Sequence, residues 1–175
     1  MRTTKRKFPT LVFLCFAAIC LAFINYPEYD YNPSTGKTSK DLPLLSLVSI
    51  SSGNPMQFPA NTLYIVSVFS SWCRSCKMEN KELLALKAAW PGIPIYGLLL
   101  MDKPENAKKF LHISGNPYKD IAKITDHEAT ALGVSAMPEI FLVNDDKVIY
   151  RFRGTTTANK ISYAIQNAFK KIEQL

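Results

Sequence analysis

A change of hydrophobic period between residues 63 and 101 constrains this chain more than any other feature. Leu63 to Phe69 reads LYIVSVF, which is nearly all apolar and rich in β-branched and aromatic residues, as in a strand buried on both faces. From Cys73 to Trp90 the apolar residues return at helical spacing, and Pro91-Gly92 stops the predicted helix. A second apolar strand is predicted from Ile93 to Met101. This order predicts a parallel pair of strands joined by a right-handed crossover.

The remaining apolar patterns add helices and hairpins to this unit. We expect helices from Glu105 to about Ile113, from Asp126 to Leu132 and from Ala158 to Ile172, and a hairpin of strands Glu139 to Val143 and Val148 to Phe152. Leu44 to Ile50 and Met56 to Phe58 suggest an N-terminal β-hairpin before the first buried strand. The expected fold is therefore an α/β sandwich with a central mixed β-sheet flanked by helices.

The N-terminus has the pattern of a membrane-targeting segment. Four basic side chains lie within the first seven residues, and the fourteen residues from Leu11 to Ile24 carry no charge. This stretch is shorter than the ~20 residues that a transmembrane helix needs and has the length of a signal-peptide core. The best cleavage sites, Ala18-Ile19-Cys20 and Cys20-Leu21-Ala22, are poor, which favours an uncleaved anchor over a cleaved signal. In both cases the basic end stays in the cytoplasm and the rest is exported.

The chain divides into three predicted parts. Residues 1–25 form the membrane anchor or signal segment, residues 26–43 a flexible polar linker, and residues 44–175 a single folded domain. The net charge of +7 does not indicate nucleic-acid binding, because four of the basic residues belong to the N-terminal segment. No later cluster of Lys and Arg with interleaved aromatic residues occurs.

Cysteine use points to one local pair. Cys15 and Cys20 lie in the apolar N-terminal segment, where they are most simply small hydrophobic residues. The exported part contains only Cys73 and Cys76, too few for a scaffold stapled by disulfides. A separation of three on a helix brings both sulfur atoms to one face, close enough for a disulfide bond. The pair is therefore either one structural bond or a site.

The position of this pair at the start of a helix favours thiol–disulfide exchange. Unsatisfied N–H groups and the helix dipole stabilise an anion there, and Arg74 adds positive charge. Cys73 is the expected nucleophile, whereas Cys76, one turn deeper, should be shielded and attack the mixed disulfide later. Zinc is disfavoured because only His112 and His127 are available as further ligands besides carboxylates. No metal or other cofactor is expected, and an inert disulfide is the remaining alternative.

Two segments of the chain resemble one protein family. Residues 71–79, SWCRSCKME, resemble the WCxxCxxE signature of extracytoplasmic thioredoxin-like proteins. Residues 133–139, GVSAMPE, resemble the GVxGxPE segment of the DsbE/CcmG branch, which serves cytochrome c maturation. The similarity covers roughly Leu44 to Thr157, and an N-terminal membrane anchor also fits that branch. The resemblance implies a thioredoxin-like sandwich, the fold that the predicted order of elements also indicates.

The resemblance implies roles for individual residues. Cys73 and Cys76 match the exchanging pair, and Glu79 matches the active-site glutamate, which could take the proton of Cys76 if burial raises its pKa. Pro138 matches a proline whose peptide bond is cis and faces the disulfide. Met137 would then offer its backbone to an extended substrate, so both residues are expected to bind substrate.

Trp72 and Glu139 are the other residues expected to bind substrate. Considered without the family, Glu79 is better explained as an exposed helix carboxylate that pairs with Lys77 or Lys81. A surface position on a strand is an equally good explanation of Glu139.

The chain also departs from the family pattern at three places. Ala136 stands where glycine is preferred, Met137 stands where alanine, valine or threonine is usual, and Asn80-Lys81 replaces a small or aromatic residue and proline. These changes affect the peptide-binding loop and the active-site helix, so they bear on substrate identity more than on chemistry.

The function implied is that of a single-pass protein of the bacterial inner membrane whose folded domain reduces protein disulfides in the periplasm. The preferred substrate is apocytochrome c, whose haem-binding CxxCH must be reduced, and the electron donor would be a membrane thiol-relay protein. A general reductase or oxidant of exported proteins is the alternative within this chemistry, because sequence does not fix the reduction potential. A redox-inert binding module and a metal-delivery protein are alternatives from other classes.

Overall fold

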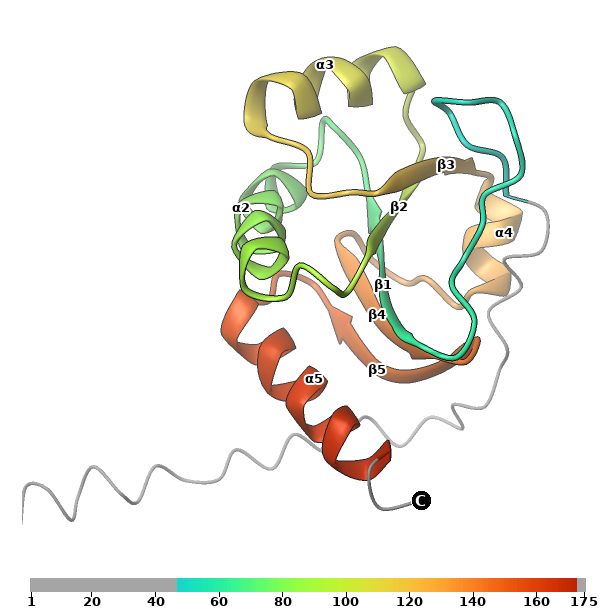
Figure 1. Ribbon diagram of the computed structural model, residues 1–175. Coiled ribbons are helices and arrows are strands. Elements are labelled where there is room, and N and C mark those ends of the chain that lie inside the picture. The colour runs from blue at the N-terminus through green and yellow to red at the C-terminus, as the bar shows by residue number, and fades with distance from the viewer. Residues whose placement is uncertain (1–46, 173–175) are drawn as a thin grey trace, which may run out of the picture. The chain divides into compact units, whose positions relative to one another are not determined.

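The structure is a computed structural model that describes residues 47–172 (Figure 1). Its centre is a five-stranded sheet with the strand order β3-β2-β1-β4-β5. The strands are β1 (Leu63–Phe69), β2 (Ile95–Leu100), β3 (Asp120–Ile124), β4 (Glu139–Asn144) and β5 (Lys147–Arg153). β2 is parallel to both β1 and β3, whereas β4 is antiparallel to both β1 and β5. The predicted mixed sheet is confirmed.

β1 occupies the centre of the sheet because its side chains are apolar on both faces. All seven of its residues are buried. Val66 pairs with Tyr96 of β2 on one side and with Phe141 of β4 on the other. A strand covered in this way has a nearly continuous apolar sequence. The carboxyl end of β1, from which the first helix departs, is thereby held in the middle of the sheet.

In the described part of the chain, four helices flank the sheet: α2 (Arg74–Ala89), α3 (Pro104–Ser114), α4 (Asp126–Ala131) and α5 (Ala158–Ile172). Figure 1 shows α2 and α5 beside each other on one side of the sheet and α4 on the other. Ala129 of α4 packs into the same buried cluster as Tyr64, Val66 and Val68 of β1. Thr125 and Glu128 form a capping box that fixes the start of α4.

Most predicted elements are present, but β3 was not expected from the sequence. Its five residues, DIAKI, form an edge strand parallel to β2, with Lys123 exposed. So short a segment contains too few residues to show a period of two. It forms a strand because it pairs with the edge of β2, so its conformation depends on a tertiary contact and not on its own sequence. The predicted hairpin of β4 and β5 is confirmed, and its turn has positive φ angles at Asp145 and Asp146.

Only part of the predicted N-terminal hairpin lies within the described residues. There the chain makes a turn closed by one antiparallel bridge between Val48 and Pro55, and Ser49 forms a second bridge with Ala122 of β3. The hairpin itself therefore stays a prediction. The predicted anchor at residues 1–25 and linker at residues 26–43 lie outside the described part of the chain. Between residues 47 and 172, no helix has both the length and the apolar character needed to cross a membrane.

Gly97 of β2 offers a test of how tightly the sheet packs. A Cβ atom at this position would lie 2.9 Å from Phe69 and 3.1 Å from Ile121. We expect Gly97→Ala to lower the free energy of unfolding by about 1–3 kcal/mol, because the extra methyl group overpacks a buried site. Denaturant titration measures this change. Gly92→Ala is the matched control, since a Cβ there meets nothing within 4 Å. Equal stability of the two variants would contradict the tight packing.

Candidate active site

Cys73 and Cys76 form a disulfide bond at the start of α2, with their Cα atoms 5.2 Å apart. Cys73 is the N-cap of the helix, and its sulfur accepts a hydrogen bond from the backbone N–H of Cys76 at 3.2 Å. Ser75 Oγ lies 3.2 Å from the same sulfur. The geometry thus places Cys73 Sγ where the backbone N–H of Cys76 and the Ser75 hydroxyl group can stabilise a thiolate.

Both cysteines are largely covered by the protein, whereas the neighbouring Trp72 is open to solvent. Cys76 is 4% exposed and Cys73 is 7% exposed, so the protein covers most of both residues in this oxidised form. Trp72 is 57% exposed, and its Nε1 donates a hydrogen bond to the carbonyl oxygen of Met101 at 3.0 Å. The indole ring is therefore held in place while much of its surface stays open beside the pair.

The turn before the disulfide is tied to the end of β2. Ser70 is fully buried, and its hydroxyl group donates to the carbonyl oxygen of Leu100. The backbone N–H of Ser71 donates to a carboxylate oxygen of Asp102 at 2.7 Å. Burial alone would raise the pKa of Asp102, but hydrogen bonds from Ser71, Lys103 and Asn106 outweigh it and hold the pKa below its usual value.

Asp102 was not predicted as part of the site. The only sequence signal for it is its position directly after the predicted strand that ends at Met101. Polar residues at the carboxyl ends of parallel strands commonly lie next to a functional site. Asp102 acts here through the Ser71 backbone and so positions the turn that carries the cysteines.

The loop before β4 faces the disulfide. The Met137–Pro138 peptide bond is cis, as the resemblance implied. Ser75 Oγ lies 3.4 Å from the carbonyl oxygen of Met137, and Ser70 Oγ lies 3.3 Å from its sulfur. The structure thus brings the loop together with the helix that carries the cysteines. Substrate binding by Trp72, Met137 and Pro138 stays a prediction.

Glu139 is fully buried, so its interpretation as a surface strand residue is wrong. Its carboxylate forms ion pairs with Arg151 and Arg153 of β5 and accepts a hydrogen bond from the Ser135 N–H at 3.1 Å. Arg151 also donates to the carbonyl oxygen of Gly133. These contacts tie both ends of the loop around Pro138 to the sheet. The observed role of Glu139 is to position this loop, and direct contact with substrate stays a prediction.

Glu79 is also buried, with 2% exposure, so its interpretation as an exposed carboxylate paired with a lysine is wrong. One carboxyl oxygen accepts a hydrogen bond from the Thr156 N–H at 3.1 Å, and the other has no partner among the described residues. Burial raises the pKa of Glu79 to about 8; the Thr156 hydrogen bond opposes this shift, and the charge of Glu82 adds to it. The carboxyl group borders a pocket of about 370 Å³ that Glu82 and Thr156 also line.

Two further residues surround Glu79. Asn80, one of the departures from the family pattern, is buried and donates to the carbonyl oxygens of Ser114 and Gly115, which fastens α2 to the end of α3. Tyr118 stacks on Phe69, and burial raises the pKa of its hydroxyl group, with an added contribution from the charge of Glu79. Burial and the charge of Glu82 thus favour a neutral Glu79, against the hydrogen bond from Thr156.

The amino-acid sequence is similar to those of thiol:disulfide interchange proteins. No family model matches the chain. It is 30% identical over 160 residues to a protein of Pasteurella multocida named probable thiol:disulfide interchange protein DsbE-2, covering 87% of this chain and 83% of that protein. It is 36% identical over 88 residues to the thiol:disulfide interchange protein DsbE of Pseudomonas aeruginosa, covering 49% of this chain and 47% of that protein.

Solved structures share the fold. A secreted Mycobacterium tuberculosis disulfide oxidoreductase homologous to Escherichia coli DsbE gives a TM-score of 0.63 at 15% identity, covering 73% of this chain and 99% of that one. The thioredoxin domain of a thiol-disulfide oxidoreductase from Bacteroides vulgatus gives 0.60 at 19% identity, covering 74% and 98%. At these identities the likeness concerns the fold alone.

The fold and the disulfide at the start of α2 together define a thioredoxin-like protein-disulfide oxidoreductase. Within that class the chain belongs to the DsbE/CcmG family of thiol:disulfide interchange proteins, as its two motifs implied.

The raised pKa of Glu79 predicts a dependence of stability on pH. Between about pH 4.5 and pH 8 the unfolded chain loses the Glu79 proton while the folded protein keeps it. Stability from this group is therefore fully present below pH 4.5 and falls by up to about 1.4 kcal/mol per pH unit as pH rises. Glu79→Gln removes the effect. Denaturant titration of both oxidised proteins across this range should show wild type losing stability relative to the variant, and parallel profiles would contradict the shift.

Proposed function

We propose that this protein is a membrane-tethered periplasmic oxidoreductase that reduces the CxxCH disulfide of apocytochrome c. The observation that carries the proposal is the position of Cys73, whose sulfur caps α2 and is bonded to Cys76 opposite the loop around Pro138. A sulfur in this position can be ionised, can attack a second disulfide and can return to its first partner without movement of the backbone.

The reaction begins with the reduced pair. The Cys73 thiolate attacks one sulfur of the substrate disulfide, a mixed disulfide forms, and the other substrate sulfur leaves as a thiolate that takes a proton from water. The Cys76 thiol then loses its proton and attacks Cys73 Sγ. The first substrate sulfur leaves as a thiolate, and the bond between Cys73 and Cys76 closes. Two electrons have passed to the substrate, and the enzyme is left in the oxidised form that the structure contains.

Glu79 is the proposed acceptor of the Cys76 proton. Both residues are buried on α2 and are separated by three positions, which places them on the same face of the helix. A general base works best when its pKa lies near the operating pH, and burial brings the pKa of Glu79 to about 8. In the reverse direction, protonated Glu79 would return the proton to the departing Cys76 thiolate.

The substrate and the location rest on the family resemblance and on the N-terminal sequence. Apocytochrome c is the substrate that the DsbE/CcmG resemblance implies, and the uncharged stretch from Leu11 to Ile24 supports a single inner-membrane anchor. The oxidised enzyme needs a two-electron thiol donor, for which we propose a membrane thiol-relay protein. A general reductase or oxidant of exported proteins uses the same site, so the partner has to be identified by experiment.

Trapping identifies the partner. Cys76→Ser should accumulate mixed disulfides through Cys73, because the attack that resolves them is lost. Cys73→Ser is the matched control and should accumulate none, with Cys15→Ser and Cys20→Ser present in both proteins. Mass spectrometry of the adducts should find apocytochrome c. Adducts with many other exported proteins would support the general reductase, and no adducts at all would contradict exchange and favour the redox-inert binding module.

Single-turnover kinetics tests whether Glu79 accepts the proton of Cys76. We expect Glu79→Gln to slow the resolution of the mixed disulfide by Cys76 at least about tenfold, because the proton acceptor is lost. The initial attack by Cys73 is measured separately and should change less. In wild type the resolution rate should rise with pH up to about 8, following the pKa of Glu79, and the variant should lack this rise. Identical pH profiles would show that Glu79 has only a structural role.

A further inference from the structure

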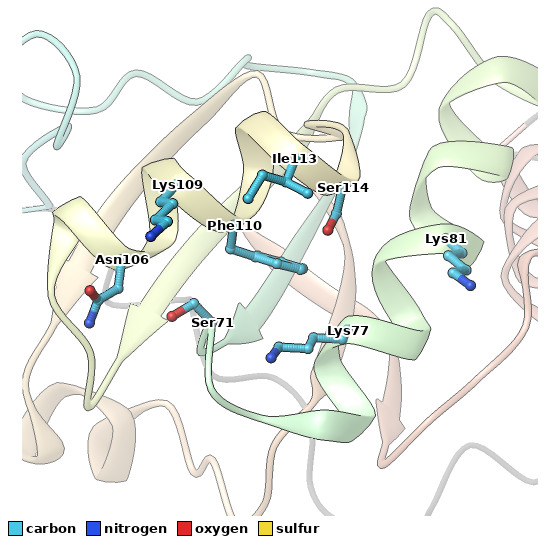
Figure 2. Close-up of a pocket in the computed structure, with 8 residues that line it drawn as sticks. All are labelled: Ser71, Lys77, Lys81, Asn106, Lys109, Phe110, Ile113 and Ser114. Atoms are coloured by element: carbon cyan, nitrogen blue, oxygen red, sulfur yellow. The ribbon is translucent and has the colours of Figure 1, made fainter.

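An open groove of about 570 Å³ lies between the N-terminal half of α2 and the length of α3 (Figure 2). It begins at Ser71, two residues before Cys73, and reaches Ser114 at the end of α3. Figure 2 shows Phe110 projecting from α3 between the two helices and Lys77 extending from α2 toward the turn that carries Ser71. The groove therefore starts at the turn that leads into the helix carrying the cysteines, and neither cysteine lines it.

The charge of the groove has one sign. Three lysines, Lys77, Lys81 and Lys109, line it, and no aspartate or glutamate does. Within residues 47–172, no ion pair joins any of these three side chains to a carboxylate. The nearby carboxylate of Asp102 is buried and already accepts hydrogen bonds from three residues, so it is poorly placed to neutralise them. The lysines are thus available to a ligand of opposite charge.

The groove is apolar as well as basic. Phe110 is half-buried, and Ile113, which lines the groove with it, is 75% exposed. A small anion would contact the ammonium groups but would leave this apolar surface in water. A polypeptide segment with both acidic and apolar side chains matches both features.

We propose that this groove docks an acidic, apolar-containing segment of the partner polypeptide whose disulfide reacts with Cys73. The inference rests on the proposed exchange through Cys73, which brings a protein partner to the segment that follows Ser71, where the groove begins. The lysines attract the acidic segment and so raise the rate at which such partners form the mixed disulfide. Phe110 and Ile113 supply the apolar contact that keeps the segment in place.

Two synthetic peptides test the docking. Each contains one intramolecular disulfide, and they differ only in a flanking arm in which Asp and Glu are replaced by Asn and Gln. Reduced full-length protein carrying Cys15→Ser and Cys20→Ser is mixed with each peptide, and acid-quenched samples are analysed by mass spectrometry. We expect the acidic peptide to react about threefold to thirtyfold faster than the amide peptide at low salt, with the advantage falling at high salt.

A matched pair of variants shows whether the preference for the acidic peptide arises in the groove. Lys109→Gln should lower the ratio of the two rates about twofold to fivefold. Lys108→Gln is the control, because it removes the same charge from an exposed neighbour on α3 that does not line the groove. It should leave the ratio unchanged.

The outcomes separate this inference from the proposed function. Equal rates with the two peptides in wild type would overturn the docking while leaving exchange intact. An equal fall in both lysine variants would also overturn it, because net charge rather than the groove would then explain the preference. No reaction with either peptide would contradict the proposed function itself.

Discussion

The structure of the site depends on the turn that connects β1 to α2. β1 is held by strands on both sides, so the point at which it ends is fixed within the sheet. Ser70 and Ser71 then tie the chain to the end of β2, through the carbonyl oxygen of Leu100 and the carboxylate of Asp102. These bonds make Cys73 the N-cap of α2 and put Cys76 one turn further on. A disulfide can open and close there because the scaffold sets the distance between the two residues.

A second constraint is the buried carboxyl group of Glu79. Burying an ionised carboxylate without a charged partner is costly, so the group is most easily kept neutral, as its raised pKa shows. The only hydrogen bond that the described residues give to Glu79 comes from the Thr156 backbone, at the start of the segment that leads into α5. Thiol–disulfide exchange needs a proton to move whenever Cys76 changes between thiol and disulfide. A carboxyl group with a pKa of about 8, on the same face of the same helix as Cys76, suits that step.

The sequence predicted the elements that depend on a local pattern. It did not predict the features that depend on contacts between distant parts of the chain. The strand-to-helix change at Cys73 and the helix from Ala158 to Ile172 follow from periodicity and lie where we expected them. β3 could not be predicted because the edge of β2 induces it. The burial of Glu79 and Glu139 also depends on distant elements, since Thr156 and the arginines of β5 are their partners. Family resemblance located both glutamates, but only the structure shows that Glu139 clamps a loop.

In the proposed function, selection of a partner would divide between two surfaces with different physical properties. The loop around Pro138 is clamped by Glu139, and main-chain pairing at such a loop would be insensitive to the partner's sequence. The Met137 side chain packs against the core, with its sulfur 3.3 Å from Ser70 Oγ, so this loop would offer mainly backbone groups to a partner. If the loop accepts many partner sequences, another surface has to distinguish one partner from another. The basic groove between α2 and α3 has both a sign of charge and an apolar patch, and these are the properties by which one polypeptide segment is distinguished from another.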